Sequence, residues 1–159
     1  MRYKVAPAPR SLDALADARA AIPLVPEPEA DCCRAIQRAT DCATRDEART
    51  VLTFLQALGL VGESERGYHR TQRPLDRGAA AEAFRRSVFL VDELLVALEA
   101  ESRDTDEAFA AVREGVPRWG RNRHADGRAV WRDTGSNLLA WGVVFGLLTG
   151  GDGYAIAAQ

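Results

Sequence analysis

Lysine, histidine and cysteine are scarce in this chain of 159 residues, which has one lysine, two histidines and three cysteines. Cys32, Cys33 and Cys42 are odd in number and two of them are adjacent, so they do not describe a disulfide framework. Zinc sites need paired ligands at short spacing, and neither His69 nor His124 lies near such a pair. The sequence therefore predicts no metal site and no cofactor.

Long apolar runs are also missing. No stretch approaches the roughly 20 apolar residues that a membrane-spanning helix needs. The first residues lack the apolar core of a secretory signal. We therefore expect a cytoplasmic protein with no membrane partner. With 47% hydrophobic and 28% charged residues, the composition is typical of a globular protein of one compact domain or two small ones.

The common catalytic motifs are absent. The chain contains no G-x-S-x-G nucleophile elbow, no G-x-x-x-x-G-K-[ST] phosphate loop and no H-E-x-x-H zinc motif. The sequence therefore favours a binding protein over an enzyme. An enzyme or ligand sensor with a pocket beneath a long apolar helix is the least favoured class.

The first half of the chain predicts three helices and a β-hairpin. Ser11 is suited to cap a short helix, and the three prolines of residues 22–29 then require a non-helical connection. A second helix begins near residue 29. Thr44 and Glu47 form a capping box for a third helix, whose apolar stripe ends at a glycine.

A hairpin is predicted over residues 60–71, because two short extended arms flank a polar tip bounded by glycines. In the second half, a broad apolar stripe predicts one long helix over residues 79–101. A last helix covers roughly 128–146, and a second hairpin covers 147–157. We place the first unit at residues 1–75 and the second at residues 76–159, giving a mainly α fold with two short hairpins around a long central helix.

The two halves repeat each other. LTFLQALGLV followed by GESERGY in the first half matches LAWGVVFGLL followed by TGGDGY in the second. The matched pairs are Leu52 and Leu139, Phe54 and Trp141, Leu58 and Phe145, Gly59 and Gly146, Leu60 and Leu147, and Tyr68 and Tyr154. A glycine stop, an apolar pair, a glycine tip and a tyrosine in both copies favour a real duplication.

Each copy, with helices followed by a hairpin, resembles the winged-helix variant of the helix-turn-helix. The residues that carry the resemblance are TRDEA at 44–48, LGLV at 58–61 and the wing GESERGY at 62–68. The pattern covers about residues 11–71 and 79–157, and it is similar to uncharacterised tandem winged-helix proteins of salt-adapted archaea. The resemblance implies a winged-helix fold and brings no established activity.

Charge is unevenly distributed, although the net charge is only −2. Any nucleic-acid binding must therefore rely on a local patch. Residues 66–86 hold six arginines against two carboxylates, and residues 113–133 hold six arginines against three. These two basic segments flank an acidic stretch at 87–112. They are suited to phosphates, although salt bridges to the acidic helix would also explain them.

The leading interpretation is a DNA-binding or transcription-associated protein that uses its first unit. Helix-turn-helix proteins place the second helix of the motif in the major groove, where arginine, glutamine and threonine can bond base edges or phosphates. The candidate residues of the helix and wing are Arg45, Arg49, Thr53, Gln56, Arg66, His69 and Arg70. A secondary basic patch comprises Arg118, Arg121, Arg123, Arg128 and Arg132.

The second copy is less suited to DNA, because its matching helix face is partly apolar. Ala140, Trp141 and Val143 are therefore candidates for an interface, with a second copy of the chain or another protein as partner. The alternative function is a protein-interaction module that does not bind DNA. Acidic residues at the start of the candidate reading helix and on its wing favour this alternative, because negative charge repels DNA.

Overall fold

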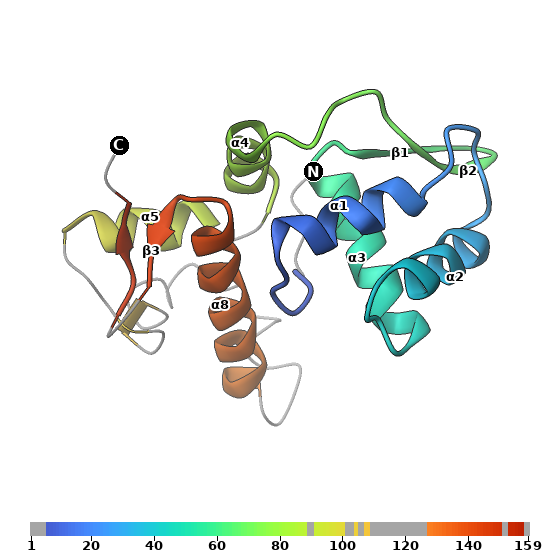
Figure 1. The fold of residues 1–159 in the computed structure, drawn as a ribbon. Coiled ribbons are helices and arrows are strands. Elements are labelled where there is room, and N and C mark those ends of the chain that lie inside the picture. Colours follow the sequence, from blue (N-terminus) through green and yellow to red (C-terminus); the bar gives the residue numbers. More distant parts are fainter. Residues whose placement is uncertain are drawn as a thin grey trace.

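The computed structural model describes residues 6–88, 91–100, 104, 107–108, 127–150 and 153–157. Its helices and strands follow one another as α1 (Leu12–Ala21), α2 (Glu29–Ala39), α3 (Arg45–Ala57), β1 (Val61–Ser64), β2 (Gly67–Arg70), α4 (Arg77–Ser87), α5 (Val91–Ala100), α8 (Gly127–Val144), β3 (Leu148–Thr149) and β4 (Ala155–Ile156). Figure 1 shows α1 to α3 with the first hairpin on one side, α5, α8 and β3 on the other, and α4 between them. The mainly helical fold with two hairpins is thus confirmed.

The helix starts of the first unit follow the capping rules. The Ser11 hydroxyl accepts a hydrogen bond from the Ala14 N–H at 3.1 Å, and the Thr44 hydroxyl accepts one from the Glu47 N–H at 3.1 Å. The Glu47 carboxylate reaches back to the Ala43 N–H. These contacts satisfy N–H groups that have no partner inside the helix. They fix where α1 and α3 begin.

The first unit has the strand arrangement of a winged helix. β1 pairs with β2 antiparallel, and Glu27, in the segment between α1 and α2, forms a one-residue β-bridge with Tyr68 at the edge of this sheet. Glu27 and Tyr68 exchange two backbone hydrogen bonds, of 3.0 and 2.8 Å. Pro26 and Pro28 flank Glu27, which suits an edge strand because proline has no N–H to donate. The proline-rich connection is therefore also a sheet edge.

The end of the long helix is repeated in both units. Gly59 and Gly146 both have positive φ, +77° and +78°. The Leu60 N–H donates to the Leu55 carbonyl, and the Leu147 N–H donates to the Gly142 carbonyl, which closes the same C-terminal motif. Each hairpin is antiparallel and begins one or two residues later. The structure therefore repeats its plan at the positions that the sequence repeat predicts.

The single long helix predicted over residues 79–101 is wrong, because α4 ends at Ser87 and α5 begins at Val91. Val88 is extended, with φ −102° and ψ 131°, and forms a β-bridge. The predicted stripe is nevertheless buried: Phe84, Val88, Val91 and Leu95 are each at most 4% exposed. The apolar spacing continues across the turn, so periodicity alone could not reveal the break. The second unit thus has a short extended link at the place where the first has its edge strand.

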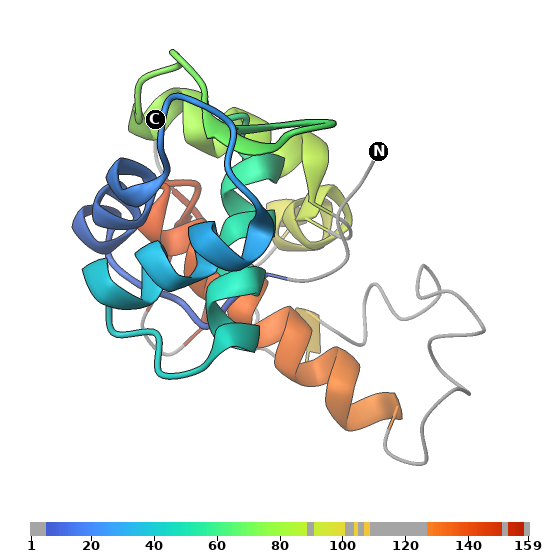
Figure 2. The same cartoon turned by 90° about the vertical axis from the view of Figure 1, so that its right-hand side faces the viewer.

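Aromatic side chains join the two units. The rings of Phe54 and Trp141, which the repeat matches, lie 4.7 Å apart between centroids. Phe54 also contacts Phe84 and Phe145. Phe54 is 0% and Phe145 2% exposed. Figure 2 shows α3 passing across α8 in that view. The two units therefore share one continuous core.

The N-terminal segment crosses the boundary between the units. The Trp141 indole N–H donates to the Pro7 carbonyl at 2.8 Å in a buried position. Three residues later, the Arg10 guanidinium bonds Asp41 at 3.0 Å and lies 3.8 Å from Glu47. Arg10 lowers the pKa of the Asp41 carboxyl, chiefly through that hydrogen bond. Residues 6–10 thus fasten α8 of the second unit to the start of α3 in the first.

Candidate nucleic-acid interface

The outer face of α3 remains open in the folded chain. Its core side is formed by Ala48, Val51, Leu52 and Leu55, each at most 2% exposed. Phe54 lies on the flank that meets the second unit. The remaining arc, at helical spacing, presents Arg45, Arg49, Thr53 and Gln56, which are exposed or half-buried. The structure thus brings the four predicted helix residues together on one surface.

Carboxylates accompany two of these four residues. Arg49 forms an ion pair with Glu29, the first residue of α2, at 3.3 Å. The Gln56 side-chain amide donates to the Glu63 carboxylate of β1 at 3.1 Å. Neither glutamate was among the predicted site residues, because these contacts join residues 20 and 7 positions apart on different elements. The sequence does not show how α2 and β1 pack against α3, so no residue spacing marks these two glutamates.

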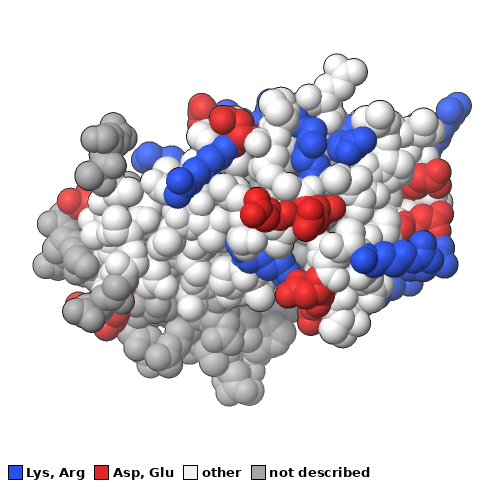
Figure 3. All heavy atoms as spheres, in the orientation of Figure 1, with Lys and Arg blue, Asp and Glu red and all other residues white. Residues whose placement is uncertain are grey.

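The pKa of Tyr68 shows which charged groups act on this surface. Burial raises the pKa of the Tyr68 hydroxyl, Glu63 and Glu29 raise it further, and Arg49 opposes them. Two glutamates and one arginine therefore act on the same ring between α2, α3 and the hairpin. The surface is locally mixed in charge. On the face shown in Figure 3, basic and acidic side chains likewise lie side by side.

The predicted wing residues are spread over the hairpin. Arg66 is exposed in the turn at its tip. His69 pairs with Gly62 and lies on the outer face, where its ring covers the glycine and its Nδ1 has no partner among the described residues. Arg70 pairs with the buried Val61 and so lies on the side facing the helices. His69 and Arg70 therefore do not share one face of the hairpin, and both are half-buried, whereas Arg66 is exposed.

Most of the secondary basic patch lies outside the described residues. Arg118, Arg121 and Arg123 lie outside the described residues. Arg128 and Arg132 lie on α8 by their backbone.

The predicted interface residues of the second unit separate into two groups. Ala140 and Val143 are half-buried on α8, so part of each is accessible. Trp141 is 0% exposed, and its prediction as a residue for binding a partner is wrong. The repeat matches it to Phe54, and the two rings seal the junction between the units. The N-terminal segment then covers its indole N–H.

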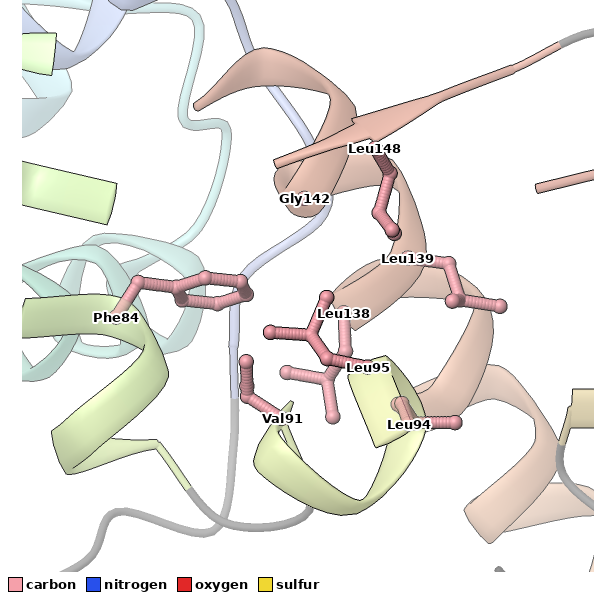
Figure 4. Close-up of a pocket in the computed structure, with 8 residues that line it drawn as sticks. All are labelled: Phe84, Val91, Leu94, Leu95, Leu138, Leu139, Gly142 and Leu148. Carbon is pink, nitrogen blue, oxygen red and sulfur yellow. The ribbon is translucent and has the colours of Figure 1, made fainter. Parts of the chain in front are cut away.

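A small apolar pocket lies within the second unit, between α4, α5, α8 and β3 (Figure 4). Gly142 stands there at the position matched to Leu55 of α3, and the Leu148 side chain fills the space that a larger residue would need. The cavity is about 10 Å³, room for about one water. Its eight lining residues offer only apolar groups and glycine, so it has neither the size nor the polar groups of a ligand site.

Within the described ranges, no three histidine, cysteine or acidic side chains lie close enough to hold a metal ion. In the same part of the chain, no helix has the length and apolar content needed to cross a membrane. The three cysteines are buried free thiols. Burial raises the pKa of Cys32 to about 11, with Cys33 and Glu27 adding to the effect.

Three helices, an edge strand after the first of them and a terminal hairpin define a winged helix, and the chain repeats that plan. Residues 1–159 match the family model described as the halobacterial double winged helix domain, and the chain belongs to this family. No match was found among curated proteins or among solved structures. Winged-helix membership suggests a DNA-binding or regulatory role in general, and such domains are typically non-enzymatic.

Proposed function

We propose that the chain binds duplex DNA through its first unit, residues 1–75, with the outer face of α3 in the major groove. The observation that carries this proposal is that the second unit packs on the Phe54 flank of α3 and leaves Arg45, Arg49, Thr53 and Gln56 uncovered. Arg49 and Gln56 have the donor groups that read guanine and adenine. Arg45 and the wing-tip Arg66 have no carboxylate within 4.0 Å among the described residues and are free for phosphates.

The test compares two charge reversals of equal size on fluorescently labelled random duplex DNA. Arg45→Glu combined with Arg49→Glu reverses two exposed arginines four positions apart on α3. Arg34→Glu combined with Arg38→Glu does the same on α2. The α3 variant should lose at least about tenfold in affinity at ~0.1 M salt, and the α2 variant should lose little. Equal losses would refute the use of the α3 face.

A protein-interaction role is the second candidate, favoured by the carboxylates on the same face. Glu29, Asp46, Glu63 and Glu65 are four acids around α3 and the wing, against Arg45, Arg49 and Arg66. Such a surface fits a basic protein segment. A labelled lysine-rich peptide should then bind the protein, and Glu29→Gln with Glu63→Gln should weaken it. Binding of the peptide without binding of duplex at ~50 mM salt would favour this candidate.

We assign the second unit, residues 76–159, to self-association. Where the first unit exposes Arg34 on α2 and carries Arg70 on β2, the matching positions of α5 and β4 hold Val96 and Ile156. Val96 is 58% and Ile156 40% exposed, and Val143 of α8 is partly accessible.

The assembly experiment is light scattering on the full chain. The wild type should be dimeric, because twofold partners are the commonest assembly. Val143→Glu or Val96→Glu should convert it to a monomer while circular dichroism stays unchanged. A wild type that is monomeric at high concentration would refute the dimer.

A further inference from the structure

The arginines of the described residues divide into two groups. Five have a carboxylate within 4.0 Å: Arg10, Arg34, Arg49, Arg85 and Arg86. Several others have none, and four of those lie where α1, β2 and the connection to α4 meet. We name these four the linker ridge: Arg19, Arg70, Arg73 and Arg77.

Contacts with the backbone connect three of the four residues of the linker ridge. The Arg19 guanidinium donates to the Arg73 carbonyl at 2.8 Å, which ties the end of α1 to the connection between the units. The Arg70 N–H donates to the Pro23 carbonyl, four residues after Arg19. Arg77 begins α4. In the upper part of Figure 3, basic side chains lie close to the surface together with some acidic ones.

Two members of the ridge lie over helix C-termini. A Cβ placed on Gly59 would lie 2.6 Å from Arg73 Nη1, and one placed on Gly146 would lie 3.0 Å from Arg77 Nη2. Each guanidinium therefore rests against the glycine that ends a long helix, α3 or α8. A helix C-terminus carries only about half an elementary negative charge. The helix ends hold these guanidinium groups in place but neutralise only part of the positive charge of each.

Nothing else in the described part of the chain neutralises the ridge. Asp76 lies next to Arg77 in sequence, but its carboxylate accepts the Ala79 N–H and caps α4. Arg19 and Arg70 are half-buried, and the enclosed Arg19 Nε–H has no acceptor among the described residues. Arg73 and Arg77 are exposed. These two exposed charges, without a carboxylate within 4.0 Å among the described residues and with two more arginines beside them, form a surface that attracts an anion.

We propose that the linker ridge binds the phosphate backbone of DNA, as a contact separate from the α3 face. The Arg73 guanidinium rests at the end of α3 and the Arg77 guanidinium at the end of α8, so the two exposed charges belong to different units. Charges spread over two units suit a linear polyanion, whereas a small anion needs donors that converge on one point. The ridge rests on the proposed DNA-binding function, but it does not depend on base reading by α3.

The test removes two ridge charges and, as a matched control, two paired charges. The ridge variant is Arg73→Gln with Arg77→Gln. The control is Arg85→Gln with Arg86→Gln, whose arginines are exposed, lie on α4 and pair with Asp92 and Glu82. Both variants change the net charge of the full chain by the same amount. Binding is measured by fluorescence anisotropy on a labelled random duplex of ~30 base pairs over a salt series.

The ridge variant should lower the slope of log affinity against log salt by about 1.8, and its affinity should fall about 60-fold at ~0.1 M salt. The control should keep the slope of the wild type. Arg73→Lys with Arg77→Lys keeps both charges and should restore the slope, which separates a charge effect from lost packing. Thermal unfolding of every variant checks that it is folded.

Three results would overturn the ridge. One is an equal change in slope for the ridge and control variants, and another is no change in either. The third is binding of inorganic phosphate to the ridge, seen by NMR, without any effect of the ridge variant on DNA binding.

The proposed α3 site is refuted by a different result. A loss of DNA affinity in the ridge variant, with no loss in the variant that combines Arg45→Glu and Arg49→Glu, would refute the α3 site and keep the ridge. A wild type that binds no duplex at ~50 mM salt would refute both.

Discussion

Phe54→Ala should strongly destabilise the whole chain, because this ring lies where the two units meet. Its side chain is 0% exposed, and three other rings surround it with centroids at 4.7 to 6.2 Å. Truncating a buried phenylalanine typically costs about 3–5 kcal/mol, and aromatic pairs add about 0.5–1.5 kcal/mol each beyond area burial. We expect a loss of about 4–5 kcal/mol, a large part of the stability of a typical domain.

The assay is urea unfolding followed by far-UV circular dichroism, with near-UV dichroism reporting the aromatic cluster. Because the units share one core, wild type and variant should each unfold in one transition, with a lower midpoint and an unchanged slope in the variant. Leu24→Ala is the control, because Leu24 is 63% exposed and its loss should change stability by less than about 0.5 kcal/mol. A loss below about 1.5 kcal/mol for Phe54→Ala, or two separate transitions in the wild type, would refute the shared core.

Three further outcomes follow from local geometry. Thr44→Ala removes the hydroxyl that accepts the Glu47 N–H and should cost about 1 kcal/mol in urea unfolding; no loss would mean that the cap is replaced by water. Gly59→Ala should lower the free energy of unfolding by about 1–2 kcal/mol, because the backbone φ at Gly59 is +77°. Gly78→Ala is the control: the backbone φ at Gly78 is not positive, and the added Cβ would meet only one atom, at 3.5 Å. This change should be neutral or stabilising. Burial raises the pKa of the Cys32 thiol from 9.0 to about 11, so the folded state favours the neutral thiol. The resulting contribution to the free energy of unfolding is present below pH 9 and is lost as pH rises toward 11. Alkylation of Cys32 at pH 8 should therefore be much slower in the folded than in the unfolded chain.

Local chemistry accounts for the parts of the fold that the sequence predicts. Capping residues such as Thr44, a glycine at each helix end and the spacing of the apolar stripes act within a few residues, so they can be read without a structure. The repeat of Gly59 at Gly146 extends this reading to the second unit. The two hairpins follow from the same short-range signals.

The break between α4 and α5 depends on contacts that the stripe does not encode. Val88 belongs to the predicted stripe and is buried as expected, yet it is extended and forms a β-bridge. A helix and a turn of two or three residues can bury the same apolar positions. The choice between them is made by tertiary pairing, which overrides local periodicity.

The sequence predicts the residues of the candidate site that lie on one helix, but it does not predict their partners on other elements. The face of α3 follows from helical spacing, so Arg49 and Gln56 could be placed together. Their partners Glu29 and Glu63, and the bond from Arg19 to Arg73, join distant parts of the chain and have no sequence pattern. The prediction that Trp141 binds a partner is wrong because the packing of the two units decides which flank of α8 is exposed. The sequence does not show that packing.

The most direct test of the central claim is an NMR titration of the isotope-labelled full chain with a random duplex, observed through backbone amide signals. The account predicts that the largest shifts fall on α3 and the wing tip, at Arg45, Arg49, Thr53, Gln56 and Arg66, and that they fade as salt rises. Shifts confined to α5, α8 and the second hairpin would contradict DNA binding by the first unit. An unchanged spectrum at ~50 mM salt would contradict DNA binding altogether.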